Sequence, residues 1–425
     1  MTYPEHDTVF TWAAPPLKIG LGALDEVGFE LQRLGARRAV ILTDSAVRAA
    51  GWSDRVERAA ADRGIDCVIY DGVHIEPTDV SITGAVEFTR AAGAFDALVA
   101  VGGGSTIDTA KAVNLLCTNS GELRDYLNAP VGLARAPSRP LKPLVAVPTT
   151  AGTGSECTAL SILDVLDLHV KTGISHSALR PTLAVIDPQV TLSMPAAVTA
   201  ASGMDVLCHA LESYTARPYT AVPRKRPDER AVYCGANPIS DIWTEHAITA
   251  LTRSLRTAVR SGSDLGARTD VMLAATYAGM GFGSAGVHIP HANAYPIAGR
   301  VRDYRPAGYP AAEPLVPHGQ AVSLTAPAAF RFTFAADPAR HIRAARLLDP
   351  TITAVADSEL LPAALIRLMR DIGIPNGIGA IGFDHGDIDD LVDGALLQQR
   401  LLAQAPRPPA AADLAGIFED SISNW

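Results

Sequence analysis

The sequence predicts an α/β domain in residues 1–195 and an all-helical domain in residues 196–425. Three observations predict this organisation. In the first part of the chain, short apolar runs alternate with segments of helical periodicity, which is typical of βαβ units that build a parallel sheet. After Pro195, long segments rich in alanine and leucine follow one another with few strand signals, so packed helices are expected. The length of 425 residues is enough for two or three domains.

Five short apolar runs are expected to form the strands of the parallel sheet. They are Ala39–Thr43, Cys67–Tyr70, Ala97–Val101, Leu144–Val147 and Leu183–Ile186. Helical periodicity between the runs predicts helices such as Ser53–Arg63 and Val80–Ala92. The last of the five runs is expected to close the α/β domain shortly before Pro195.

Seven segments of the second domain have helical periodicity. They are Ala196–Tyr214, Asp241–Ser261, Leu265–Met280, Gln320–Phe332, Ala336–Leu348, Leu360–Ile372 and Asp387–Leu402. Because few strand-like runs separate them, this domain is predicted to consist of helices that pack against one another.

Composition narrows the class of protein. Nearly half of the residues are apolar and 19% are charged, as in a chain that folds around a core. The net charge is −9 and no basic run forms a surface for nucleic acid. The five cysteines form no CxxC pair, so neither a disulfide framework nor a cysteine zinc site is indicated. No apolar run reaches membrane-spanning length and no signal-peptide pattern is visible, so a cytoplasmic protein without a membrane partner is expected.

A glycine-rich run, VGGGSTIDTAK, follows the third predicted strand and opens a helical segment. Gly103, Gly104 and Ser105 are candidates for binding a pyrophosphate, because glycines let backbone N–H groups approach a ligand and a helix N-terminus carries partial positive charge. Ser105 is expected to cap that helix. The run does not match GxGxxG, and a turn without a ligand is the alternative. Asp108 is expected to contact a ribose or a nicotinamide edge; an acid that complements the helix dipole is the alternative.

Two further loops carry polar residues directly after predicted strands. Asp44 follows the first strand, where the ribose of a dinucleotide lies in a doubly wound sheet. A carboxylate there accepts from a 2′-hydroxyl and repels a 2′-phosphate, which favours NAD over NADP; a helix N-cap is an equally good alternative. Thr149 and Thr150 lie in the loop PTTAGTGSE, and their hydroxyls are candidates for contacts with adenine or ribose. A structural turn is the alternative for this loop.

Asp205 and His209 are four residues apart in a predicted helix, so their side chains share one face. Such residues are uncommon on an apolar helix unless they are paired. His318 and one of two neighbouring histidines, His288 or His291, would complete a set of four, and spacing does not decide between the last two. Three imidazoles and one carboxylate suit Fe(2+) or Zn(2+), so a metal centre in the helical domain is predicted.

Together, these motifs resemble those of the iron-containing alcohol dehydrogenase family. The shared motifs follow the family's order over nearly the whole chain: GGGSTIDTAK, PTTAGTGSE, MDVLCHALESY and PHGQAV. The resemblance implies a dehydroquinate-synthase-like fold, with an N-terminal dinucleotide-binding domain that takes NAD and a helical metal-binding domain. It implies that one metal, Fe(2+) or alternatively Zn(2+), is held by Asp205, His209, His291 and His318.

Other segments are similar to a transhydrogenase branch of this family. They are EPTD, GAFDALVAVGGGST, NPISDIW and GFGSAGVHIPHANAYPIAG. This resemblance implies that 4-hydroxybutyrate is oxidised to succinic semialdehyde while 2-oxoglutarate is reduced to 2-hydroxyglutarate, with NAD recycled inside the enzyme. Many family members carry a further histidine four residues after the third ligand, where this branch and this chain have tyrosine. Tyr295 is therefore a candidate proton donor.

Alternatives remain open at this point. An NAD-dependent alcohol dehydrogenase of the same family would act on another small alcohol or aldehyde. A dehydroquinate-synthase-like lyase would need basic residues for a phosphorylated substrate, whereas the segment around Asp205 is apolar. A protein that only binds metal or nucleotide is disfavoured by the combination of the two motif sets.

The resemblance also implies a dicarboxylate substrate and an oligomeric assembly. A dicarboxylate needs a cation near the reacting atoms, and the candidates are Lys171, Arg300 and Arg302. Family members are usually dimers or larger, so the resemblance implies a homo-oligomer that acts on small molecules.

Overall fold

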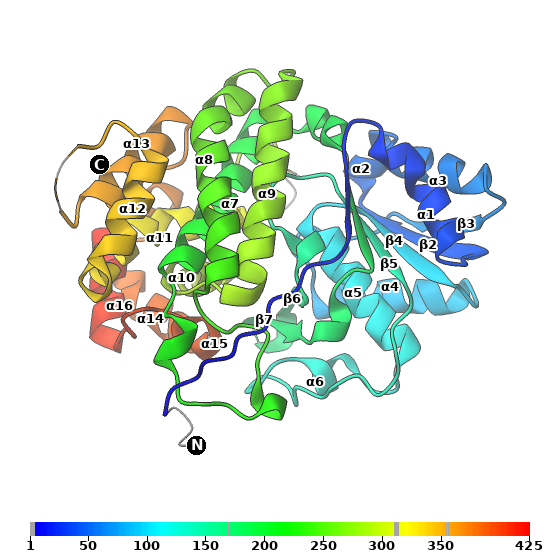
Figure 1. The fold of residues 1–425 in the computed structure, drawn as a ribbon, viewed down its shortest axis with the longest axis horizontal. Helices are drawn as coiled ribbons and strands as arrows, with labels where there is room; N and C mark the ends of the chain where they lie inside the picture. Colours follow the sequence, from blue (N-terminus) through cyan, green and yellow to red (C-terminus); the bar gives the residue numbers. More distant parts are fainter. Residues whose placement is uncertain (1–4, 169, 310–313, 354, 356) are drawn as a thin grey trace. The chain divides into compact units, whose positions relative to one another are not determined.

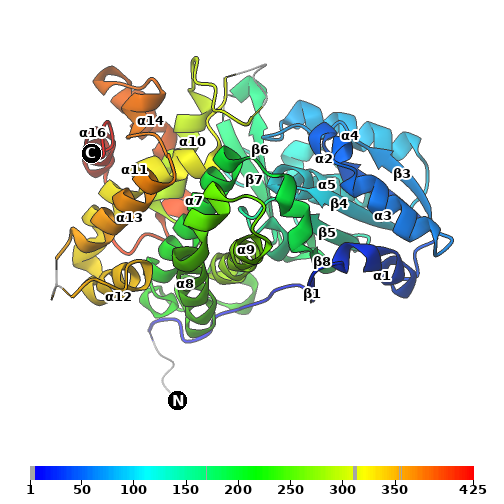
Figure 2. The ribbon, with the colours of Figure 1, turned by 90° about the horizontal axis from the view of Figure 1, so that it is seen from above.

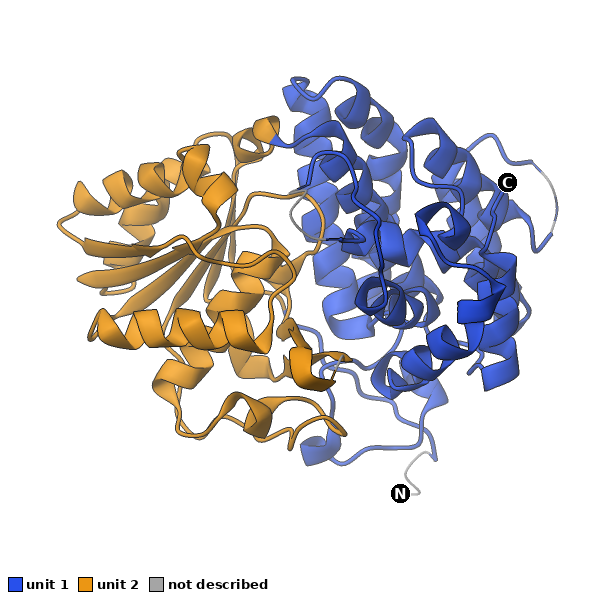
Figure 3. Cartoon of the chain, turned by 180° about the vertical axis from the view of Figure 1, so that it is seen from behind, with its two compact units in different colours: residues 1–13, 194–425 blue, residues 14–193 orange. Residues whose placement is uncertain are grey.

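The computed structural model describes residues 5–168, 170–309, 314–353, 355 and 357–425. The chain forms two compact units, which Figure 3 shows in different colours. Unit 2 is Ala14–Ser193, and unit 1 comprises Met1–Ala13 together with Met194–Trp425. The predicted limits of two folding domains, 1–195 and 196–425, stay a prediction, since compactness by itself does not show which segments fold independently.

The centre of unit 2 is a six-stranded parallel sheet with the order β1-β8-β5-β4-β2-β3 (Figure 1). Its strands are β1 Leu17–Ile19, β2 Arg38–Thr43, β3 Asp66–Tyr70, β4 Ala97–Gly102, β5 Leu144–Pro148 and β8 Leu183–Ile186. Five of them match the predicted runs to within one residue, which confirms those predictions. β1 was not predicted, because three residues are too few to show an apolar pattern.

Both faces of this sheet are buried by helices (Figures 1 and 2). The helices of unit 2 are α1 Val27–Arg33, α2 Ser45–Ala49, α3 Trp52–Ala61, α4 Asp79–Ala91, α5 Gly104–Thr118 and α6 Leu123–Tyr126. Val40 and Leu42 of β2 belong to one apolar cluster, whereas Ala39 and Ile41 belong to a second one. Because successive side chains of a strand point to opposite faces, each strand contributes to two cores, which explains why the runs are continuously apolar.

A two-stranded antiparallel sheet lies between β5 and β8 in the chain. It consists of β6 Leu160–Val165 and β7 Val170–Ser175. These strands were not predicted, because polar residues such as Ser161, Asp164 and Lys171 interrupt their apolar pattern. Apolar side chains of the pair nevertheless join the core on the face that α4 and α5 cover.

Unit 1 is built from helices, and its described residues contain no strand. They are α7 Ala196–Thr215, α8 Pro238–Arg260, α9 Leu265–Ala285, α10 Ile289–Gly299, α11 His318–Thr333, α12 Pro338–Leu348, α13 Leu360–Asp371, α14 Ile388–Leu396, α15 Gln399–Leu402 and α16 Ala411–Asp420. All seven predicted segments are helical, the last as two helices, whereas α10 and α16 were not predicted. α7 is buried over most of its length and packs against α8, α9 and α11. Among the described helices, none combines the length and the apolarity that a membrane crossing requires.

The N-terminal residues group with unit 1 because they contact it directly. The Asp7 backbone N–H donates to the Val222 carbonyl at 3.0 Å, and the Asp7 carboxylate lies 2.8 Å from the Arg230 guanidinium. Further along, the Trp12 indole N–H donates to the Met280 carbonyl at 2.9 Å. These contacts join residues more than two hundred positions apart, and no local sequence pattern signals them.

Candidate functional site

Helix α7 presents polar side chains inside an otherwise apolar core. Asp205, His209 and Glu212 follow one another at intervals of four and three residues, which places them along one face of the helix. All three are buried. Because burying a charged or polar group is costly unless it has a partner, the surroundings of this face decide what it does.

The neighbouring helices bring two more histidines to that face. His291 lies in the first turn of α10 and His318 begins α11. Gly319 allows the close approach, since a Cβ atom there would lie 2.0 Å from the Ala201 carbonyl oxygen and 2.8 Å from the Asp205 Cβ atom. A side chain at position 319 would therefore push the start of α11 away from α7.

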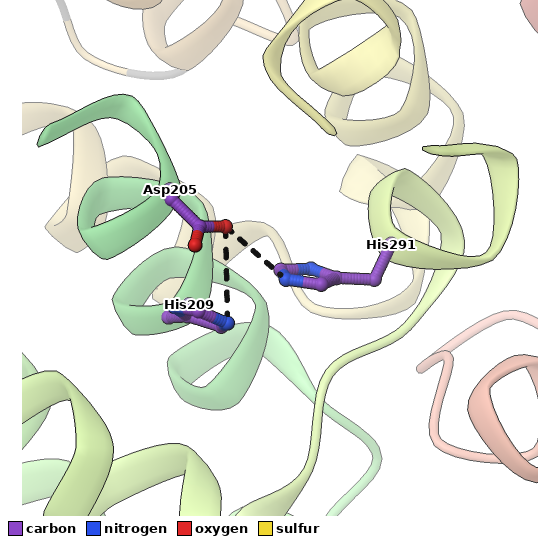
Figure 4. A group of neighbouring side chains, drawn as sticks. All are labelled: Asp205, His209 and His291. Carbon is purple, nitrogen blue, oxygen red and sulfur yellow. Dashed lines mark ion pairs between the residues drawn. The ribbon is translucent and has the colours of Figure 1, made fainter. Parts of the chain in front are cut away.

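Three imidazole nitrogens surround one carboxylate oxygen. The Nε2 atoms of His209, His291 and His318 lie 3.9, 3.6 and 3.9 Å from Asp205 Oδ1. Figure 4 shows Asp205 and His209 on one helix, with His291 facing them from another. Donor atoms of these three buried residues all lie within 4.8 Å of one another. The structure thus brings together the four residues that were predicted as metal ligands.

Two of the atoms that face each other have no hydrogen-bond partner among the described residues: Asp205 Oδ1 and His291 Nε2. A buried polar atom without a partner costs about 1–3 kcal/mol, so a protein rarely leaves two in one place without a ligand. A carboxylate oxygen and imidazole nitrogens are ligands for Fe(2+) and Zn(2+). The donor set therefore fits a divalent transition metal.

Electrostatics favour a cation at this place. Burial alone would raise the pKa of the Asp205 carboxyl, but His209, His318 and His291 hold it below its usual value. Burial lowers the pKa of His209 to about 3, which leaves this imidazole neutral. Burial also opposes a charge on His291, yet Glu212 and Asp205 raise its pKa to about 9. The negative potential that would hold a proton on His291 would equally favour a metal ion.

Glu212 is part of this site and was not predicted. Its Oε1 atom accepts from His291 Nδ1 at 2.6 Å, and its Oε2 atom accepts from the His288 backbone N–H at 2.7 Å. The available signal was a further acid on an apolar helix, three residues after His209. Glu212 contacts His291 and does not itself face Asp205 Oδ1, and a residue that supports a ligand from behind has no spacing rule of its own.

His288, the competitor of His291, lies elsewhere. Its Nε2 atom is 3.1 Å from the Thr215 hydroxyl, and its ring meets Phe330 edge to face. It precedes the first turn of α10, whereas His291 lies within that turn. The geometry therefore favours His291 as the third imidazole. Tyr295, one turn further along α10, is buried, and its ring centroid lies 6.3 Å from that of His318.

In unit 2, two predicted nucleotide-binding segments lie at the point where the strand order reverses. From β2 the chain continues to β3 on one side and then to β4 on the other. In doubly wound sheets, ligands bind outside the carboxyl ends of the strands at this switch point. Asp44 follows β2 and the glycine run follows β4. Asp44 Oδ1 accepts the backbone N–H groups of Ala46 and Val47, both at 2.9 Å, so it acts as the N-cap of α2.

The glycine run packs closely against the second predicted loop. A Cβ atom on Gly104 would lie 2.5 Å from the Thr153 side chain, and one on Gly103 would lie 3.1 Å from the Thr150 hydroxyl. The Thr149 N–H also donates to the Gly102 carbonyl at 3.0 Å. Two loops more than forty residues apart are thus adjacent.

Ser105 differs from its predicted capping role. The N-cap of α5 is Gly103, no side chain caps this helix, and the Ser105 hydroxyl accepts the Glu76 N–H at 3.1 Å. The expectation was wrong by two positions because α5 begins already at Gly104. The Thr106 and Ile107 N–H groups both donate to the Gly103 carbonyl at 3.1 Å.

Asp108 is engaged inside unit 2. Its Oδ1 atom accepts from the Ser155 hydroxyl and its Oδ2 atom accepts from the Ile162 N–H at 2.9 Å. Lys111 lies 3.7 Å from the same carboxylate. This arrangement joins α5 to β6, and the expected contact of Asp108 with a ribose or nicotinamide stays a prediction.

The three cations considered for a substrate carboxylate are each paired with acids. Lys171 contacts Glu76 and lies 3.2 Å from Asp164. The other two are Arg300, 3.3 Å from Asp390, and Arg302, which pairs with Asp387. In these contacts, none of the three cations pairs with Asp205 or Glu212.

The chain is similar to known proteins in both sequence and structure. A hydroxyacid-oxoacid transhydrogenase of Rattus norvegicus is 45% identical over 422 residues, which cover 98% of this chain and 90% of the relative. The structure of a 1,3-propanediol oxidoreductase is 31% identical with a TM-score of 0.84, covering 97% of this chain and 100% of that chain. A sulfoacetaldehyde reductase of Bifidobacterium kashiwanohense, solved with NAD+, is 25% identical with a TM-score of 0.80, covering 97% and 98%. The predicted fold class is thereby confirmed.

The expected cytoplasmic location is contradicted, because the rat transhydrogenase is named a mitochondrial protein. The expectation rested on the composition of the first residues and on the absence of a long apolar run. Neither property describes the compartment in which a folded enzyme works, since targeting segments are read and removed separately from the fold.

Two family models match the chain. The model of iron-containing alcohol dehydrogenase matches residues 15–188, and that of the C-terminal part of the Fe-containing alcohol dehydrogenase family matches residues 229–422. Together they cover most of both units, so the protein is an enzyme and an oxidoreductase. With its motifs, its fold and its relatives in agreement, this chain belongs to the iron-containing alcohol dehydrogenase family.

Proposed function

We propose that this enzyme is a metal- and NAD-dependent hydroxyacid-oxoacid transhydrogenase. It oxidises 4-hydroxybutyrate to succinic semialdehyde and reduces 2-oxoglutarate to 2-hydroxyglutarate. The observation that carries the proposal is the convergence of three imidazole nitrogens on Asp205 Oδ1, within a chain 45% identical to a transhydrogenase.

The residues proposed to hold the metal are Asp205, His209, His291 and His318. The name of the family supports Fe(2+), and the same donors would also accept Zn(2+). A divalent ion there would supply Lewis acidity, which lowers the pKa of a substrate hydroxyl and polarises a substrate carbonyl in the reverse direction. Phe282 stacks on the His209 ring at 4.0 Å and keeps water from that side. Tyr295, near His318, is proposed to donate a proton to the keto oxygen of 2-oxoglutarate as that oxygen becomes a hydroxyl, and the phenolate that results would take up the proton that 4-hydroxybutyrate releases.

The proposed NAD site lies at the switch point of the unit 2 sheet. Gly103, Gly104 and Ser105 would offer backbone N–H groups to the pyrophosphate, as helix N-termini do. Asp44 would accept from the ribose, and its second carboxylate oxygen would be used because Oδ1 caps α2. The remaining contacts are proposed for Asp108, Thr149 and Thr150. The NAD+ held by the sulfoacetaldehyde reductase of the same fold supports this cofactor.

An isotope experiment tests the proposal. Purified enzyme receives 2-oxoglutarate and 4-hydroxybutyrate with deuterium at C4, without added NAD, and the products are analysed by mass spectrometry. Direct recycling on a bound cofactor predicts that deuterium appears at C2 of 2-hydroxyglutarate. The His209→Ala variant serves as the control without a complete ligand set. Absence of 2-hydroxyglutarate unless NAD is added would contradict the transhydrogenase.

One alternative is supported by an observation. The 31% identical 1,3-propanediol oxidoreductase favours an NAD-dependent alcohol dehydrogenase that releases its cofactor. In that case reduction of added NAD by a small alcohol would be the main activity. The lyase alternative is not proposed, because the family model and the relatives that match the chain are those of oxidoreductases.

Assembly into a homo-oligomer stays a prediction. Light scattering on the purified protein measures the mass directly, and a value equal to that of one chain would contradict it.

A further inference from the structure

Glu212 stands out among the buried acids of unit 1. It is 0% exposed, and the ion pairs of the described residues connect it with no lysine or arginine. The ion pairs of Asp205 among the described residues are likewise with histidines. Two buried carboxylates thus share a region without a permanently charged cation among the described residues. A divalent ion would balance both negative charges.

The contact of Glu212 with His291 decides the orientation of the imidazole. Oε1 lies 2.6 Å from Nδ1, while Nε2 lies on the other side of the ring, 3.6 Å from Asp205 Oδ1. An ionised carboxylate only accepts hydrogen bonds, so Nδ1 carries the hydrogen. A metal that replaces the proton on Nε2 would then meet the lone pair of this atom on the side of Asp205, in the tautomer that coordination requires.

The same carboxylate also holds the backbone of His291. Oε2 accepts the N–H of His288 at 2.7 Å and the N–H of His291 at 3.4 Å. These groups belong to the start of α10, which has no capping side chain of its own. Glu212 therefore acts as an N-cap provided by another helix, and its negative charge suits a helix N-terminus. The ring and the backbone of one ligand are fixed by one side chain.

We propose that Glu212 is a positioning residue that sets the metal affinity of the site by orienting His291 and increasing the basicity of its Nε2 atom. This inference rests on the proposed metal centre at Asp205, His209, His291 and His318. It goes beyond it, because Glu212 does not contact the metal position. α7 would then supply two ligands and the support of a third.

The Glu212→Gln variant tests the inference. A glutamine has one accepting and one donating terminal atom, so it cannot accept from His291 Nδ1 and from the His288 N–H through separate atoms. One contact is lost, or the imidazole takes the other tautomer and turns an N–H toward the metal. The matched control is Glu245→Gln, since Glu245 contacts Tyr214 of α7 and Arg343 but no histidine of the cluster.

The measurement is the dissociation constant for Co(2+) in chelator-stripped protein, followed by competition with a chelator and by the d–d absorption of bound cobalt. Glu212→Gln is expected to bind cobalt about 10- to 100-fold more weakly and to change the absorption, whereas Glu245→Gln binds like the wild type. The His291→Ala variant marks the affinity without the third imidazole.

The outcomes separate the two proposals. If the wild type binds no cobalt, or if His291→Ala binds as tightly as the wild type, the proposed metal centre is wrong. If His291→Ala loses affinity while Glu212→Gln keeps it, only the role of Glu212 is overturned. Far-UV circular dichroism of the metal-free variants checks that they are folded.

A second measurement does not need the variant to fold. Wild-type protein with nitrogen-15-labelled histidines is loaded with Zn(2+), and the protonation of each ring is read by NMR. His291 is expected to keep a hydrogen on Nδ1 and to bind through Nε2. A hydrogen on Nε2, or coordination through Nδ1, would overturn the inference.

Discussion

Two buried ionic clusters in this enzyme differ in one respect. In unit 2, Lys111 donates to four oxygens at 2.7–3.1 Å, from Ser155, Thr158 and Leu160, and pairs with Asp108. In unit 1, Asp205 Oδ1 and His291 Nε2 face each other without hydrogen-bond partners among the described residues. The polar atoms of the first cluster are held by hydrogen bonds, whereas two facing atoms of the second are not held by any described residue. Buried charge alone therefore indicates no binding site, whereas facing donor atoms without hydrogen bonds support a place for a ligand.

The largest effect is expected from Asp205→Asn. Loss of the carboxylate of the proposed metal site should lower kcat at least about 1,000-fold, which corresponds to about 4 kcal/mol of transition-state stabilisation. The metal-free variant should unfold at a temperature close to that of the metal-free wild type, because asparagine has nearly the volume of aspartate and Asp205 Oδ1 accepts no hydrogen bond from the described residues that would be lost. Steady-state kinetics and thermal unfolding measure both. An Asp205→Asn enzyme with the activity of the wild type would show that the cluster in unit 1 is not a metal site.

Lys111→Met should lower the free energy of unfolding, whereas Asp205→Asn should lower kcat. Its removal leaves the Asp108 carboxylate buried without a cation, and the expected loss in unfolding free energy is about 3 kcal/mol. Urea denaturation of the metal-free protein measures it. The control is Lys142→Met, an exposed lysine of the same unit, for which a change within about 0.5 kcal/mol is expected. Equal midpoints for the two variants would show that the Lys111 cluster is dispensable.

The third prediction concerns the metal itself. Returning Zn(2+) to stripped wild-type enzyme at about 100 times its dissociation constant should stabilise the helical unit by about 2.7 kcal/mol. The Asp205→Asn variant should show no such shift, because the site lacks its carboxylate. Differential scanning calorimetry with and without metal gives the answer. A shift of the same size in both proteins would place the bound metal elsewhere.

The smallest effect concerns Lys171, which forms a third ionic cluster with Glu76 and Asp164. Burial opposes its charge, but Glu76 and Asp164 hold the pKa of this lysine above its usual value. A group whose pKa is raised by folding stabilises the protein below its unfolded pKa and loses this contribution as the pH rises through the folded value. The wild type should therefore lose stability relative to Lys171→Met as the pH rises from about 10, where an unfolded lysine begins to lose its proton, to about 12. A difference that is constant over this range would contradict the pairing.

Local patterns in the sequence determined most of the architecture. Five parallel strands were predicted because strands buried on both faces are continuously apolar, as Val99 and Leu98 of β4 show by entering opposite cores. The spacing of Asp205 and His209 was equally sufficient, since two residues four apart on a helix share a face in every protein. The hairpin of β6 and β7 was missed because polar residues interrupt its apolar pattern. These residues have partners in other elements, as Lys171 shows by contacting Glu76.

The tertiary structure alone decided how the site is completed. Whether His288 or His291 joins the cluster depends on where α10 begins, and the role of Glu212 depends on that helix start lying beside α7. In the same way, Asp108 is occupied by Ser155 and Ile162. Periodicity describes neighbours within one element, whereas these contacts join elements tens of residues apart. Only the packing of whole helices determines which buried polar atoms of the described residues find a hydrogen-bond partner, and it leaves Asp205 Oδ1 and His291 Nε2 facing each other among those that do not.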